Sequence, residues 1–173
     1  MNKFLSFSHC VICTVLQFMY FNFSGGGIPT KSITEIAGQS GVGKTQLCLQ
    51  LCANVQLPEK LGGLDGNCIY FDCHGGFSSQ RLQQIIEPTK EMAINVLKEM
   101  KEDFRPLKAK DFLAGIIYRR ISDVEDLVKA LDYMAEHILP ENDSFRLLVI
   151  DRLVLTRQYL GKTHIHSHLR NIT

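Results

Sequence analysis

The sequence has almost no net charge. Its 19 lysines and arginines against 18 aspartates and glutamates leave a formal charge of +1 at pH 7. A protein that attracts nucleic acid or an anionic membrane through its overall field needs a marked excess of positive charge. The composition therefore gives no such bias. Basic residues prevail only in residues 152–173, which hold no acidic residue, and we expect this divergent basic tail to be a solvated chain end.

The sequence also lacks the cysteine pattern of a disulfide framework, although it contains six cysteines. Cys48 and Cys52 lie on the apolar face of a predicted helix, and Cys68 lies in a predicted buried strand. Buried free cysteines behave as small apolar residues, and free thiols are typical of a reducing compartment. Cys10 and Cys13 form a C-x-x-C, but no second pair with zinc spacing follows. We therefore expect neither disulfides nor structural zinc.

Residues 1–24 are rich in apolar side chains but lack an uninterrupted run that could cross a membrane. Lys3 precedes an apolar centre, as in a signal peptide, yet no small-x-small cleavage site follows. His9, Gln17 and Asn22 interrupt the apolar run. We expect an atypical N-terminal segment that packs loosely or self-associates, and no membrane partner, with a targeting role as the alternative.

A glycine-rich motif at residues 38–45 carries most of the chemistry. It reads Gly-Gln-Ser-Gly-Val-Gly-Lys-Thr and matches G-x-x-x-x-G-K-[ST], the pattern of a phosphate-binding P-loop. Glycines let successive backbone N–H groups turn toward an anion, the lysine suits the β- and γ-phosphates, and the threonine hydroxyl suits Mg²⁺. A strand-like segment at 32–37 precedes it and helical spacing at 47–55 follows, as the motif requires. An ordinary glycine-rich turn is the alternative. The predicted phosphate-binding residues are Gly38, Gln39, Ser40, Gly41, Val42, Gly43, Lys44 and Thr45.

The rest of the chain alternates predicted strands and helices. Apolar runs predict buried strands at residues 68–71, 116–118 and 147–150. Helical patterns run from Ser79 to about Asp103, where Pro88 is expected to divide the helix, and from an S-x-x-E capping box at Ser122 to Pro140. Such alternation favours an α/β fold with a mostly parallel sheet flanked by helices and a ligand at the carboxyl ends of the strands.

Asp151 ends the last predicted strand. Four apolar residues followed by an aspartate are typical of a Walker B strand, whose carboxylate reaches the Mg²⁺ shell beside the P-loop hydroxyl. On its own the pattern is weak, because buried strands often end in aspartate. Together with the P-loop it predicts Thr45 and Asp151 as the metal-binding residues.

Further blocks resemble a known family. They are Gly-Gly-Gly-Ile at 25–28, Ser-Ile-Thr-Glu at 32–35, Gly-Lys-Thr-Gln-Leu-Cys at 43–48, Val-Gln-Leu-Pro at 55–58 and Tyr-Phe-Asp at 70–72. Over residues 25–151 the chain resembles the ATPase core of eukaryotic RecA-like recombinases, in particular the C-type DNA-repair paralogue of the strand-exchange recombinase. Residues 116–119 and 146–151 favour that type.

The resemblance implies a RecA-like P-loop ATPase core that uses ATP and Mg²⁺. It implies a nuclear role in homologous recombination and double-strand break repair, within a complex of recombinase paralogues on branched or single-stranded DNA. It also implies that Arg81 stacks near the adenine, although Arg81 is equally consistent with a surface helix residue.

One departure concerns catalysis. The family reads Asp-Thr-Glu-Gly where this chain reads Asp72-Cys73-His74-Gly75, so His74 stands at the position of the general base. A positioned base contributes about 10²- to 10⁴-fold to a rate. With Lys44 and His74 as the catalytic candidates, we expect ATP binding with poor hydrolysis. The alternative function is a catalytically impaired, truncated paralogue that serves as a nucleotide-dependent protein-interaction module.

A second departure concerns the sheet. The resemblance stops after Asp151, where Arg152 replaces a small residue, so the core is expected to be truncated after Walker B. In the RecA-like sheet the next strand lies between the Walker B strand and the P-loop strand. We find no candidate for it after residue 151 and therefore expect an unpaired gap in the sheet and a marginally stable chain.

Overall fold

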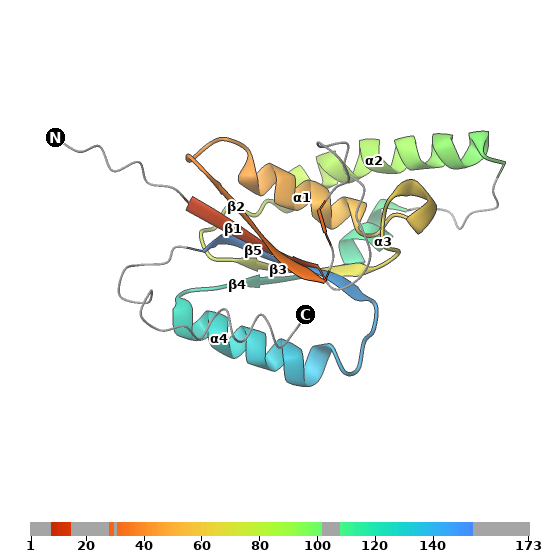
Figure 1. The fold of residues 1–173 in the computed structure, drawn as a ribbon. Coiled ribbons are helices and arrows are strands. Elements are labelled where there is room, and N and C mark those ends of the chain that lie inside the picture. The colour runs from red at the N-terminus through yellow and green to blue at the C-terminus, as the bar shows by residue number, and fades with distance from the viewer. Residues whose placement is uncertain (1–7, 15–27, 30, 102–107, 154–173) are drawn as a thin grey trace.

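A computed structural model describes residues 8–14, 28–29, 31–101 and 108–153. These residues form one five-stranded sheet with helices on both faces (Figure 1). The strands are β1 (Ser8–Thr14), β2 (Ser32–Gly38), β3 (Asn67–Asp72), β4 (Ile116–Arg120) and β5 (Phe145–Leu153). Their order is β2-β1-β5-β3-β4. Strand β3 pairs in parallel with both β4 and β5, which confirms the predicted α/β class.

The predicted gap beside the Walker B strand does not exist. Strand β1 occupies that place and pairs antiparallel with β2 on one side and β5 on the other. Because β1 opposes both neighbours, β2 and β5 run in the same direction. The expectation of a loosely packed N-terminus is thus wrong for residues 8–14. Extended β-branched residues at 11, 12 and 14 suit a strand, and the backbone groups of β2 and β5 need partners.

Helices cover the two faces unequally. On one face lie α1 (Lys44–Asn54), α2 (Ser79–Glu99) and the short α3 (Ala109–Ala114), and on the other lies α4 (Val124–Tyr133), which continues as a π-turn over Met134–Ile138. A 3₁₀ turn at Glu59–Leu61 joins α1 to β3. Along β3, Cys68 and Tyr70 pack toward α1 and α2, whereas Ile69 and Phe71 pack toward α4. Burial on both faces explains why this strand is apolar throughout.

Two predicted helix boundaries need correction. Pro88 does not divide α2, which runs unbroken through it. The neighbouring turns are held by burial of Ile85 and Ile86 and by the Thr89 hydroxyl, which donates to the Ile85 carbonyl at 2.8 Å. Packing of this face therefore outweighs the loss of one backbone hydrogen bond at the proline.

The cap of α4 lies one residue after the predicted position. Asp123, not Ser122, is the N-cap, and its carboxylate accepts the N–H of Asp126 at 2.8 Å. Asp126 in turn accepts the backbone N–H of Ser122 at 3.0 Å. This backbone hydrogen bond holds the pKa of Asp126 below its usual range. The reciprocal cap thus uses two aspartates in place of the serine–glutamate pair.

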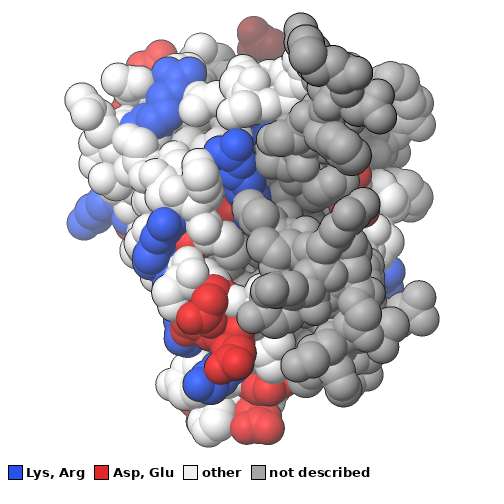
Figure 2. Space-filling view, turned by 90° about the vertical axis from the view of Figure 1, so that its left-hand side faces the viewer, with Lys and Arg blue, Asp and Glu red and all other residues white. Residues whose placement is uncertain are grey.

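Charges of both signs are mixed on the surface. On the face drawn in Figure 2, lysines and arginines stand apart from one another, and a group of acidic side chains lies in the lower half of the view. This mixed face agrees with the near-zero net charge of the sequence. None of the helices in the described ranges combines the length and the apolar character needed to cross a bilayer.

Candidate functional site

The P-loop connects β2 to α1 and turns through two left-handed glycines. Gly41 has φ of 85° and Gly43 has φ of 98°, and Gly43 is the N-cap of α1. Side chains strongly disfavour this backbone region, so glycine is required at both positions. The loop thereby delivers the chain to the first turn of α1, where unpaired N–H groups and the helix dipole attract anions.

Lys44 places a buried cation inside the loop. Its ammonium donates to the Gly38 carbonyl at 2.9 Å and to the Gln39 carbonyl at 2.7 Å. The residue is only 9% exposed. These carbonyls hold the ammonium against the loop. A phosphate bound in the loop would accept a further hydrogen bond from the same ammonium.

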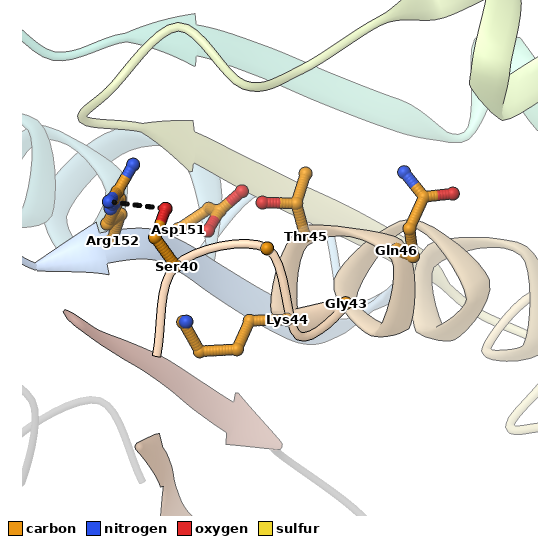
Figure 3. A pocket seen from close by; sticks show the side chains of 8 residues that line it. Ser40, Gly43, Lys44, Thr45, Gln46, Asp151 and Arg152 are labelled. Carbon is orange, nitrogen blue, oxygen red and sulfur yellow. Dashed lines mark hydrogen bonds between the residues drawn. The ribbon is translucent and has the colours of Figure 1, made fainter. Parts of the chain in front are cut away.

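Strand β5 brings Asp151 to the same place from far along the chain. Asp151 is 2% exposed and lines a pocket of about 260 Å³ together with Ser40, Gly41, Gly43, Lys44, Thr45, Gln46 and Arg152 (Figure 3). A Cβ built on Gly76 would lie 3.5 Å from the Thr45 hydroxyl and 3.8 Å from Asp151 Oδ2. The hydroxyl and the carboxylate thus face one small space bordered by the backbone of Gly76. An alcohol and a carboxylate are oxygen ligands of the kind that Mg²⁺ takes.

Tyr70 fixes the orientation of the Asp151 carboxylate. The Tyr70 hydroxyl donates to Asp151 Oδ2 at 2.6 Å, and both residues are buried. Burial, and after it the negative charge of Asp151, raises the pKa of Tyr70 far above its ordinary value. Tyr70 therefore remains a hydrogen-bond donor. The sequence does not reveal this role, because the apolar run of β3 shows only that Tyr70 is buried.

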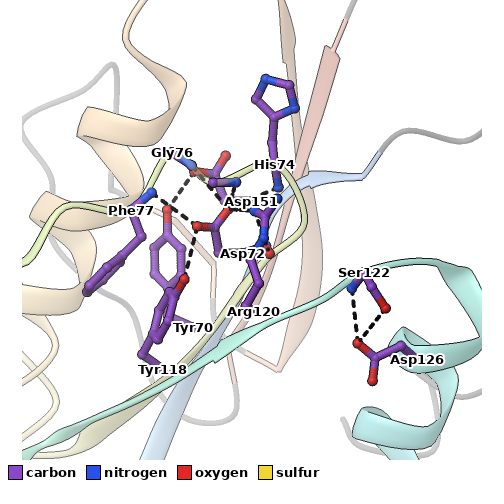
Figure 4. A network of polar contacts seen from close by, with 11 residues as sticks. Tyr70, Asp72, His74, Gly76, Phe77, Tyr118, Arg120, Ser122, Asp126 and Asp151 are labelled. Carbon is purple, nitrogen blue, oxygen red and sulfur yellow. Dashed lines mark hydrogen bonds and ion pairs between the residues drawn. The ribbon is translucent and has the colours of Figure 1, made fainter.

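Asp72 organises the loop that follows β3. Its buried carboxylate accepts the backbone N–H groups of His74, Gly75, Gly76 and Phe77 at 2.6 to 3.2 Å (Figure 4). Arg120, which ends β4, adds an ion pair at 3.0 Å. Gly75 has φ of 82°, which lets the loop close over the carboxylate. Asp72 with glycines three and four residues later, at Gly75 and Gly76, is a turn signal in the sequence.

The same loop also carries His74, whose side chain does not contribute to the hydrogen bonds around Asp72. His74 is exposed, and in Figure 4 its ring points away from the Asp72 carboxylate, to which only its backbone N–H donates. Phe77 closes the other end of the loop and packs its ring 5.0 Å from Tyr70 and 4.5 Å from Tyr118. The loop is therefore fixed by its backbone and by Phe77, with the imidazole left on the surface.

Arg81 and Arg152 lie on opposite sides of the P-loop. Arg81, in the first turn of α2, donates through Nε to Gln46 at 2.6 Å and is exposed. Arg152 follows Asp151 and donates to the Ser40 hydroxyl at 3.3 Å. Arg81 therefore lies beside α1, whereas Arg152, which differs from the small residue of the family pattern, lines the same pocket as Ser40 and Asp151.

Comparison with known proteins gives one family. Residues 12–169 match the Rad51 family model, a wider range than the resemblance noted over 25–151. The chain is 35% identical over 141 residues to mouse (Mus musculus) DNA repair protein XRCC3, covering 82% of this chain and 37% of that protein. It is 33% identical over 159 residues to DNA repair and recombination protein RadA of Aeropyrum pernix, covering 84% and 44%. It is 32% identical over 157 residues to DNA repair protein RAD51 homolog 3 of Cricetulus griseus, covering 87% and 42%.

The chain belongs to the Rad51 family, and the predicted resemblance to eukaryotic RecA-like paralogues is confirmed. Its identity to each of these three relatives lies between 32% and 35%. The chain spans less than half the length of these curated relatives.

Proposed function

We propose that this chain binds ATP with Mg²⁺ and acts in DNA recombination and repair. The single observation that supports ATP binding most strongly is the shared pocket. The P-loop and Asp151, which are far apart in the sequence, line one small cavity. The relatives named above are DNA repair and recombination proteins, which supports the cellular role.

Each part of the nucleotide site has a proposed task. The loop Gly38–Thr45 holds the phosphates, and Lys44 supplies a positive charge to the β- and γ-phosphates. Thr45 and Asp151 bind Mg²⁺, directly or through its waters. A bound Mg²⁺ would neutralise charge on the phosphates. Arg81 lies near Gln46, on the α1 side of the loop, and is proposed to border the adenine.

We further propose that hydrolysis is slow because His74 stands at the position of the family's glutamate. An imidazole can accept a proton, but its reach and charge differ from those of a carboxylate. The chain would then hold ATP and use it to control contacts with other recombinase paralogues in the nucleus. DNA would be met chiefly through that complex, since a net charge of +1 gives the chain no overall attraction for DNA.

An equilibrium titration with a fluorescent ATP analogue, with and without Mg²⁺, tests the binding site. Lys44→Ala should weaken binding about 10- to 100-fold, because a charge-assisted contact contributes about 1.5 to 3 kcal/mol. Lys129→Ala, an exposed lysine on α4 at the opposite face of the sheet, is the matched control and should leave the affinity unchanged. Equal affinities of the Lys44 variant and the unmutated chain would contradict the proposal.

Steady-state ATP turnover tests the hydrolysis proposal. His74→Glu restores the family's carboxylate and should raise turnover by about 10² or more if a missing base limits the rate. His74→Ala should leave the low rate unchanged. Fast turnover of the unmutated chain, insensitive to His74→Ala, would refute slow hydrolysis. A paralogue-binding assay with and without ATP then separates an ATPase from the alternative function, a nucleotide-dependent interaction module.

A further inference from the structure

Arg152 lies at an irregularity in the strand that carries the Walker B aspartate. Between the pairs His9–Leu153 and Val11–Ile150, strand β5 has one more residue than β1. Arg152 lies within this bulge, and its backbone adopts φ of 71°, in the left-handed region. Arginine has no special tolerance for this region, which costs about 1 to 2 kcal/mol for an ordinary residue. Bulges of this kind often lie beside functional sites, where they re-aim a side chain.

The bulge directs the Arg152 side chain to the tip of the P-loop. Its guanidinium donates to the Ser40 hydroxyl at 3.3 Å and lines the pocket shared by Lys44, Thr45 and Asp151 (Figure 3). In this view Arg152 lies beside Ser40 and Asp151, on the far side of the loop from Gln46. The contact with Ser40 uses one of the five N–H donors of the guanidinium.

The chemistry of this position suits a phosphate. A guanidinium is always charged, and its planar donors match the oxygens of a phosphate group. Lys44 already supplies one cation to the pocket from within the loop. A second cation beyond the loop tip is best placed for the terminal phosphate, because the other phosphates lie closer to the loop and the start of α1.

We propose that Arg152 is a second phosphate-binding cation of this site, which contacts the terminal phosphate and makes the chain prefer a nucleoside triphosphate to a diphosphate. This inference rests on the proposed ATP binding. It concerns a residue that differs from the small residue of the family pattern. A purely structural role for Arg152, in which it only ties β5 to the P-loop through Ser40, is the competing explanation.

Affinities for Mg²⁺–ADP and for Mg²⁺ with the non-hydrolysable triphosphate AMP-PNP distinguish the two explanations. Arg152→Gln removes the charge but keeps a donor for Ser40, and Arg152→Gly keeps the left-handed backbone while removing the side chain. Each should weaken triphosphate binding about tenfold or more and change diphosphate binding less than about twofold. Arg119→Gln removes an exposed arginine that pairs with Asp126 on α4, and should change neither affinity.

Each outcome decides the matter. Equal losses for both nucleotides, or no loss for either, overturn the inference. If the unmutated chain binds AMP-PNP, Lys44→Ala weakens that binding and Arg152→Gln does not alter it, then ATP binding stands and only the role of Arg152 fails. If the unmutated chain binds neither nucleotide, the proposed function fails and the inference fails with it.

Discussion

Two glycine-rich loops follow strands β2 and β3, and they use their backbone groups in opposite ways. The loop after β2 holds a cation, because the Lys44 ammonium lies on the carbonyls of Gly38 and Gln39. The loop after β3 holds an anion of its own, because the Asp72 carboxylate takes the N–H groups of residues 74–77. The first loop therefore presents positive charge to its pocket, whereas the second is closed around a carboxylate.

This difference shows why glycine content alone does not define a phosphate site. N–H groups that converge on a point form an anion site, but in the β3 loop an internal carboxylate already occupies that point. Its glycines let the chain wrap around Asp72 and bring the backbone of Gly76 close to Thr45 and Asp151. The second loop thus borders, through Gly76, the space between Thr45 and Asp151.

The two loops also differ in how the sheet supports them. Strand β3 lies between β5 and β4, with a parallel neighbour on each side. Strand β2 lies at the edge of the sheet order and pairs with β1. The P-loop is thus joined to the Walker B strand through the N-terminal strand, so its geometry depends on β1.

The largest effect on stability is expected from Asp72→Ala, which breaks the β3 loop. The change leaves several backbone donors without their acceptor and removes the partner of Arg120, which is half exposed. Loss of two or more hydrogen bonds to a charged group, each worth about 1.5 to 3 kcal/mol, should lower the free energy of unfolding by about 3 to 5 kcal/mol, and urea unfolding measures it. Glu125→Ala, at an exposed position in the first turn of α4, is the control. A loss below about 1 kcal/mol would show that the loop does not need its carboxylate.

A slightly smaller loss of stability, about 3 kcal/mol, is expected from Ile12→Pro in β1. Position 12 pairs with Thr34 on one side and Val149 on the other, so proline removes a ladder hydrogen bond in the middle of the sheet. ATP affinity should fall as well, because the P-loop strand loses its support. Thermal unfolding and nucleotide titration measure the two effects, with Ile12→Val as the conservative control. An unchanged melting temperature would show that β1 does not support the sheet.

Much of the first loop was predictable because its signals are local. The P-loop pattern, the short strand before it and the apolar spacing after it all lie within residues 32–55. The strand that carries Asp151 was predictable from the four apolar residues before it, since β5 is buried on both faces. The shared pocket then follows from the rule that parallel strands present their carboxyl ends at one edge.

The contacts that join the second loop to the rest of the site, and the place of β1, could not be predicted because they are formed by tertiary pairing. Asp72 is joined to Arg120 from another strand, and Tyr70 to Asp151 across the sheet. The place of β1 is set by its backbone pairing with β2 and β5, and this pairing leaves no signal in the pattern of side chains. The helix through Pro88 likewise depends on burial against α1. Each of these features is decided by tertiary contacts, which outweigh local propensity.

Tyr70→Phe tests the link between the two loops with a moderate effect on metal binding. The Tyr70 ring packs against Phe77 of the second loop, while its hydroxyl orients Asp151 in the site of the first. Without this hydrogen bond to a carboxylate, worth about 1.5 to 3 kcal/mol, the Mg²⁺ concentration needed for ATP binding should rise about tenfold. Tyr133→Phe, which alters an exposed tyrosine on α4, is the control. Mg²⁺ dependence that stays the same in both variants would contradict the role of Tyr70.

The smallest effect concerns Cys73, the first residue of the second loop. Burial, and after it the charge of Asp72, raises the pKa of the Cys73 thiol to about 12. Since an unfolded cysteine has a pKa of about 8.5, the folded chain binds this proton more tightly. Its contribution to stability is fully present below about pH 8.5 and is lost as the pH rises toward 12.

Iodoacetamide labelling at pH 8, followed by peptide mass spectrometry, measures the same property, because only the thiolate reacts. Cys73 in the folded chain should react roughly 10²-fold more slowly than in urea. A thiolate fraction about 10³-fold lower is partly offset by the greater nucleophilicity of a more basic thiolate. Opening the loop with Asp72→Ala should restore fast labelling. Equal rates in the folded and unfolded chain would show that the second loop is open around its carboxylate, which would remove its contrast with the P-loop.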